Sequence, residues 1–223
     1  MHTARRIVAL TLSFAILVLG GCIPLAVGST ARPAEVGERQ LTTSVFVVPN
    51  GVSLRESSKS ASQFGVDAEA RSGLSDRSDL GLRFTSVSGV VASYKRRLNG
   101  FTSDPGFATA VMVGGGLVNF GLHAEVEGSL MISASGDGNV TPYGGLRVVQ
   151  VVPISSAAVH DTPTAGGYMG ARFGRADFGF STELGVFYDH SALGLRKQNF
   201  IVVPSISLHG NAGSILRRLT LGR

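Results

Sequence analysis

Apolar and polar residues alternate with a period of two along most of the chain after residue 40. Such alternation is typical of β-strands, because successive side chains of a strand point to opposite faces of its sheet. Turn residues separate the alternating segments, and ten strands are predicted. Their ranges are 41–48, 64–72, 78–86, 89–98, 106–115, 120–134, 140–152, 165–174, 176–189 and 199–210.

The strand predicted at 120–134 illustrates what the alternation separates. Leu122, Val126 and Leu130 share one face, whereas Glu125 and Glu127 share the other. The strand at 176–189 follows the same rule and carries an aromatic residue near each end of its apolar face. The length of this strand and the aromatic residues near its ends match a tilted strand that spans a membrane.

The connections between the predicted strands differ in length. Long polar connections fall at 49–63, 153–164 and 190–198, all after odd-numbered strands, while the even connections are short. Two odd connections, near Val87 and Leu117, are also short. In an antiparallel order the long connections lie at one end, as in membrane barrels. The predicted fold is therefore all-β, a single antiparallel up-and-down β-barrel of about ten strands, with eight possible, over residues 41–210.

The N-terminus has a different character from the rest of the chain. Arg5 and Arg6 precede an uncharged apolar run, 7–19, that is too short to span a bilayer as a helix. Small residues follow at Gly20 and Gly21. This order of a basic, an apolar and a small-residue region predicts an export signal peptide at 1–21 that is removed from the mature protein.

The segment Leu19-Gly20-Gly21-Cys22 resembles the lipobox of bacterial lipoproteins. The resemblance implies that Cys22 is acylated, for example with palmitate, and becomes the lipidated N-terminus. Ile23, rather than Asp, implies transit to the outer membrane. Because Cys22 is the single cysteine, the folded part is expected to have neither a disulfide nor a thiolate metal site. Residues 22–40 lack alternation and are predicted to be a flexible tether.

Two segments resemble those of small outer-membrane β-barrel proteins, which include uncharacterised barrel-like lipoproteins. One is Arg71-Ser72-Gly73-Leu74-Ser75-Asp76-Arg77-Ser78-Asp79-Leu80-Gly81-Leu82-Arg83, and the other is Gly179-Phe180-Ser181-Thr182-Glu183-Leu184-Gly185-Val186-Phe187-Tyr188-Asp189. The resemblance implies a barrel in the outer membrane and supplies no catalytic residue. Members of that class usually end on a strand with a terminal aromatic residue, whereas a basic tail, 211–223, follows here.

Alternation does not reveal which face of the barrel is inside. If the apolar face meets lipid, the protein is a membrane barrel with a charged interior and a structural or surface-interaction role. If the apolar face lines the interior, the protein is a soluble periplasmic lipocalin-like carrier of a lipid or small apolar molecule, tethered to the membrane. Finding Glu125, Glu127 and Arg147 inside would favour the first, and Leu122, Val126 and Leu130 inside would favour the second.

In the membrane-barrel interpretation the charged face is the interior. The candidate interior charges are Glu69, Arg83, Glu125, Glu127, Arg147, Arg172 and Glu183, accompanied by Asp67, Arg71, Lys95 and Arg97. Acidic and basic residues are nearly equal in number, and a barrel of this size encloses little more than side chains. We therefore expect paired charges and a closed interior.

Other chemistry has weak support. Ser207, His209 and Glu183 could form a Ser-His-Glu arrangement, but such spacing is common by chance. His123, His160 and His190 are too far apart in sequence to predict a metal site, and the glycines at 114–116 lack the Lys-Ser/Thr of a phosphate loop.

The charge of the chain is nearly balanced. Without Arg5 and Arg6, 18 basic residues remain against 15 acidic ones, and most basic residues are scattered singly along the chain. We expect no enzyme activity, cofactor, metal or nucleic-acid partner; the expected partner is membrane lipid at Cys22.

Overall fold

The computed structural model describes residues 26–53, 60–85, 88–100, 106–135, 139–154, 163–175, 178–188 and 200–211. In these residues ten antiparallel strands form one closed barrel. The strands are β1 (Arg39–Ser53), β2 (Ser60–Ser75), β3 (Ser78–Thr85), β4 (Gly89–Arg97), β5 (Gly106–Val118), β6 (His123–Ser135), β7 (Val140–Pro153), β8 (Thr164–Gly174), β9 (Phe178–Tyr188) and β10 (Phe200–Asn211). No helix in this part of the chain is long and apolar enough to cross a membrane.

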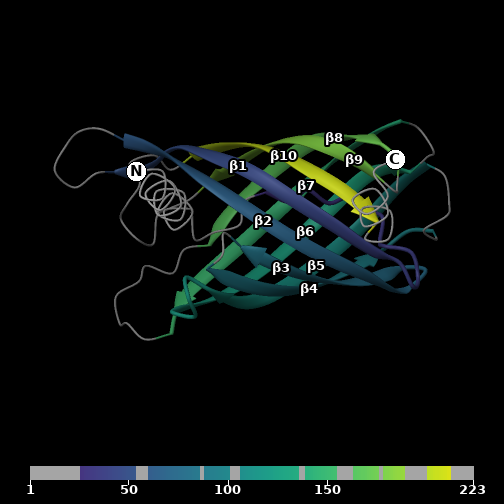
Figure 1. Ribbon diagram of the computed structural model, residues 1–223, viewed down its shortest axis with the longest axis horizontal. Coiled ribbons are helices and arrows are strands. Elements are labelled where there is room, and N and C mark those ends of the chain that lie inside the picture. The colour runs from purple at the N-terminus through teal and green to yellow at the C-terminus, as the bar shows by residue number, and fades with distance from the viewer. Residues whose placement is uncertain are drawn as a thin grey trace, which may run out of the picture.

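Each strand pairs with its neighbour in sequence, and β1 pairs with β10 to close the wall. Figure 1 shows the strands inclined to the long axis, with the blue first strand beside the yellow last strand. The predicted all-β, up-and-down barrel of ten strands is confirmed. The signal peptide, the lipobox residues Leu19, Gly20 and Gly21, the anchor Cys22 and tail residues 212–223 lie outside the described residues.

Several predicted strand boundaries differ from the structure by one to five residues, and two of them have a clear local reason. The strand expected to end at residue 48 continues to Ser53, because β1 and β2 resume pairing at Val52 and Ala61 after a bulge. The strand expected to begin at Phe120 begins at His123. Asn119 and Phe120 have positive φ angles of 52° and 55°, and left-handed backbone belongs to a turn rather than a strand.

The antiparallel order places alternate connections at opposite ends of the barrel. We call one the loop end, with connections at 54–59, 86–88, 119–122, 154–163 and 189–199. The other is the turn end, with connections at 76–77, 98–105, 136–139 and 175–177. The termini of the barrel wall, Arg39 and Asn211, both lie at the turn end.

The apolar face of the wall points outward. Leu122, Val126 and Leu130 are 52%, 59% and 47% exposed, whereas Glu125 and Glu127 are 1% and 3% exposed. The aromatic pair Phe173 and Phe180 lies toward the turn end, and Tyr188 and Phe200 pack together at the loop end. An apolar outer band with aromatic residues near both edges is suited to a bilayer. The apolar-lined carrier considered from the sequence is therefore wrong.

The chain preceding β1 does not run freely away from the barrel. We call residues 26–38 the N-terminal segment. Its first part, 26–34, lies inside the wall, where Ala26, Val27, Ala31 and Ala34 are buried, whereas residues 35–37 are exposed. A parallel bridge between Val36 and Gly73 marks where the segment reaches the turn end before β1 begins. The prediction of a flexible tether over 22–40 is wrong for this part, because buried side chains of the wall bond to its backbone.

Candidate functional site in the barrel lumen

The first group of lumen charges lies near the turn end. Arg71 donates to Glu69 and to Asp79, with both shortest N–O distances at 2.6 Å. Lys95 lies 3.4 Å from the other oxygen of Asp79. These residues come from β2, β3 and β4, where alternate positions face inward. The sequence placed Asp79 on the same polar face as Arg83, but Asp79 was missing from the predicted set of interior charges.

A second group lies on β3, β6 and β7. The carboxylate of Glu127 accepts hydrogen bonds from Arg83, at 2.7 Å, and from Arg147. Glu125 lies 3.7 Å from Arg83. Arg147 lies on β7, which neighbours β6, whereas Arg83 lies on β3, which is separated from β6 by β4 and β5. The carboxylate of Glu127 therefore joins two strands that are not neighbours in the wall. Gly114 permits this packing, because a Cβ at that position would lie 2.9 Å from a carboxylate oxygen of Glu127.

Inward-facing acidic and basic side chains of the strands are equal in number in the described wall. The acidic residues are Asp67, Glu69, Asp79, Glu125, Glu127 and Glu183, and the basic residues are Arg71, Arg83, Lys95, Arg97, Arg147 and Arg172. All are buried except Arg172, which is half-buried on the inward face of β8. Charges in such a water-poor interior require partners, because an isolated buried charge is strongly destabilising.

Acidic side chains hold the N-terminal segment through its backbone N–H groups. Glu183 accepts from Val27 at 2.9 Å and from Gly28 at 3.1 Å, one bond to each carboxylate oxygen. Asp79 accepts from the N–H of Ala34 at 2.8 Å. Glu183 was predicted as a partner of interior bases, yet its hydrogen bonds go to the N-terminal segment.

Basic side chains hold the carbonyl groups of the same segment. Lys95 donates to the carbonyls of Thr30 and Arg32 at 3.1 and 3.0 Å, and to the hydroxyl of Ser29 at 3.0 Å. Arg147 donates to the carbonyl of Ala26 at 3.2 Å. Residues 26–35 belong to no strand, so their backbone groups have no sheet partner. The side chains of the wall supply the donors and acceptors that these backbone groups need.

Small residues allow the N-terminal segment to fit. Val27 and Ala31 pack in an apolar cluster with Ala108, Ala110, Met112, Met131, Tyr143 and Tyr168. Gly28 has a φ of +56°, and a Cβ there would lie 2.8 Å from the hydroxyl of Ser207. Glycine satisfies both the left-handed backbone and the close approach. These small residues were the one feature of the sequence that is consistent with a packed segment. A flexible tether has the same composition, so the sequence could not distinguish the two.

The structure does not assemble the Ser-His-Glu arrangement considered from the sequence. Ser207 bonds to Ser44 at 2.7 Å, while His209 contacts the hydroxyls of Ser181 and Thr42 at 2.8 and 3.2 Å. Glu183 is occupied by the N-terminal segment. His123 lies beside Asn119 at the loop end, and His160 and His190 lie outside the described residues. Within the described ranges, no group of three His, Cys, Asp or Glu residues could hold a metal ion.

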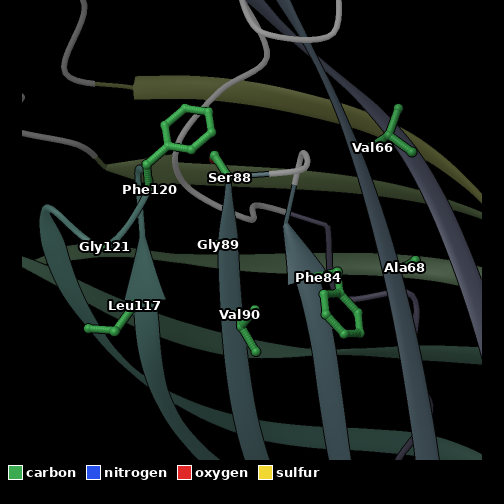
Figure 2. Close-up of a pocket in the computed structure, with 9 residues that line it drawn as sticks. All are labelled: Val66, Ala68, Phe84, Ser88, Gly89, Val90, Leu117, Phe120 and Gly121. Atoms are coloured by element: carbon green, nitrogen blue, oxygen red, sulfur yellow. The ribbon is translucent and has the colours of Figure 1, made fainter.

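A hollow of about 550 Å³ lies on the outer face toward the loop end. Figure 2 shows its lining, which includes Val66 of β2, Phe84 of β3, Val90 of β4, Leu117 of β5 and Phe120 of the following turn. The backbone N–H of Phe120 donates to the carbonyl of Ser88 at 2.7 Å, which ties two loop-end turns together. The hollow is part of the apolar outer band, because its large apolar lining residues belong to the outward face of the wall.

A closed antiparallel wall with an apolar outer face and a charged interior is the arrangement that a bilayer requires of a spanning sheet. The wall therefore has the architecture of a membrane β-barrel, with ten antiparallel strands in a closed order and an apolar outer face. No protein-family model matches the chain, and no curated protein matches it in sequence. The assignment of this architecture rests on the geometry of the barrel itself.

The solved structures that match this chain include two bacterial surface or outer-membrane proteins. The Neisserial surface protein A (NspA) is 12% identical; the match covers 78% of this chain and 96% of that one, with a TM-score of 0.40. The outer membrane protein OprG from Pseudomonas aeruginosa is also 12% identical, with 82% and 100% covered and a TM-score of 0.32.

Proposed function

We propose that this chain is a lipid-anchored protein of the bacterial outer membrane with a structural or surface-interaction role rather than a catalytic one. The observation that carries the proposal is the content of the lumen. Paired acids and bases from β2, β3, β4, β6 and β7, together with the N-terminal segment, occupy the space inside the wall. A pore that selects ions would instead favour one sign of charge along an open path.

In this proposal the protein is held in the membrane in two ways, by acyl chains at Cys22 and by the barrel wall. Each buried methylene contributes about 0.8 kcal/mol, so an acyl thioether at Cys22 with a further acyl chain on its amine would hold firmly. A barrel does not need such an anchor to stay in the membrane. We infer that the lipid at Cys22 serves to fix the position of the N-terminus.

Conductance in planar bilayers tests the closed lumen. The full-length protein should show no steady ion current, because the interior charges neutralise one another and the N-terminal segment fills the remaining space. A barrel of known conductance, inserted under the same conditions, confirms that current would be seen. Reproducible stepwise currents from the wild-type protein would contradict the proposal and would make a small porin the better account.

A further inference from the structure

The N-terminal segment runs through the lumen in one defined direction. Ala26 belongs to an apolar cluster with Phe46, Val48, Phe187, Ile201 and Val203, all in the part of the wall toward the loop end. Gly28 lies against Ser44 and Ser207, nearer the middle of β1 and β10. Ala34 bonds to Asp79 and Val36 pairs with Gly73, both at the turn end. The upstream end of the segment is thus directed toward the loop end.

The distance from Ala26 to Cys22 is limited by the chain. The turn end of β10, at Asn211, lies eight residues beyond Val203, or about 26 Å along the strand at roughly 3.3 Å per residue. A tilt of about 40° makes this about 20 Å along the barrel axis. Four extended residues span at most about 14 Å, so Cys22 cannot return to the turn end while the segment stays seated.

The wall itself gives the acyl chains no lateral exit. Every strand is hydrogen-bonded to two neighbours, including β1 to β10. Lipid attached to Cys22 can therefore reach a bilayer from this position only over the rim at the loop end. In outer-membrane barrels the longer loops face the cell exterior and the short turns face the periplasm.

We propose that the barrel displays its own acylated N-terminus at the loop end, so that the lipid of Cys22 enters the outer leaflet of the membrane. The inference rests on the proposed function, since it requires both acylation and insertion in the outer membrane. The lumen is then a binding site for the N-terminal segment, built from Glu183, Asp79, Lys95 and Arg147. The partner of the displayed terminus is the lipid surface itself.

An epitope inserted between Ile23 and Pro24 of the full-length chain tests this placement. Antibody binding is compared on intact cells and after permeabilisation of the outer membrane. Two controls carry the same epitope, one between Asp76 and Arg77 at the turn end and one at residue 194 in the connection 189–199. We expect the N-terminal and 194 epitopes to bind antibody on intact cells, and the turn-end epitope only after permeabilisation.

A single substitution keeps the test valid where an insertion disturbs assembly. Pro24→Lys adds one amine next to Cys22, and Arg77→Lys is its matched control at the turn end. A membrane-impermeant amine reagent on intact cells should label residue 24 and leave residue 77 unlabelled, as read by mass spectrometry of the peptides.

The outcomes separate the two proposals. If the tagged protein takes up palmitate and its N-terminal epitope is reached only after permeabilisation, the display inference is overturned while the lipoprotein proposal stands. If no palmitate is taken up, or if the epitope at 194 is hidden on intact cells, the proposed function is contradicted. The display inference, which rests on it, is then contradicted as well. A labelled protein whose N-terminal and 194 epitopes are both accessible on intact cells supports both.

Discussion

Glu183 on β9 accepts a hydrogen bond from the backbone N–H of Val27 at 2.9 Å, across 156 positions of the sequence. Its second oxygen accepts from Gly28, so one buried carboxylate fixes two consecutive peptide units. The barrel thus uses its interior charges in two ways, pairing some with each other and using others to hold its own N-terminal segment.

Replacement of Glu183 should release this segment. Glu183→Ala leaves two buried N–H groups without their charged acceptor, and a hydrogen bond to a charged group contributes about 1.5–3 kcal/mol. Hydrogen exchange on the detergent-solubilised protein should show faster exchange of the Val27 and Gly28 amides. Glu35→Ala, at an exposed position of the same segment, is the control. Unchanged protection in Glu183→Ala would mean that the apolar contacts alone hold the segment.

A charge on the outer face should impair insertion. Leu130 lies near the middle of β6 and is 47% exposed on the apolar face. Arginine there would meet hydrocarbon, at a cost of about 2–4 kcal/mol near the bilayer midplane. Leu130→Arg should lower the urea midpoint of unfolding in lipid vesicles, whereas Leu130→Ile should leave it nearly unchanged. If the arginine variant inserts and unfolds as the wild type does, this face does not meet lipid.

Loss of an interior base should destabilise the barrel. Arg147 bonds to Glu127 and to the carbonyl of Ala26, so Arg147→Ala removes a partner from both. Breaking a buried ion pair costs about 3–5 kcal/mol, because the remaining charge is left in a water-poor site. The thermal midpoint of the folded band on unheated gels should fall. Arg77→Ala, at an exposed turn, should change it little. An unchanged midpoint in Arg147→Ala would contradict the structural role of these charges.

Acylation at Cys22 can be tested directly. Cys22→Ala should remain an unprocessed precursor, because the thioether cannot form and cleavage by the lipoprotein peptidase depends on it. Growth with a clickable palmitate analogue should label the wild type and not the variant. A wild-type protein that takes up no label would remove the lipoprotein assignment, and the barrel would remain.

The period-two pattern was sufficient to predict the number and order of strands. Alternation is a local property, because adjacent side chains of a strand must point to opposite faces. Where turn residues also occur within a strand, boundaries were misplaced: Pro49 lies within β1, which continues to Ser53. The charged face of each strand could also be predicted from the alternation. Six of the seven predicted lumen charges are buried, and Arg172 is half-buried.

The sequence by itself determined that this chain forms about ten antiparallel strands with one apolar and one charged face. Only the tertiary structure decided which face lies inside, because a pattern of period two is the same whichever way the sheet curls. The tertiary structure also decided the pairing in the lumen, since Glu127 meets Arg147 on the neighbouring strand β7 and Arg83 on β3, which is not a neighbour of β6, only once the wall has curled into a barrel. The polar contacts of the N-terminal segment are made mostly by its backbone groups, which leave no side-chain pattern in a sequence.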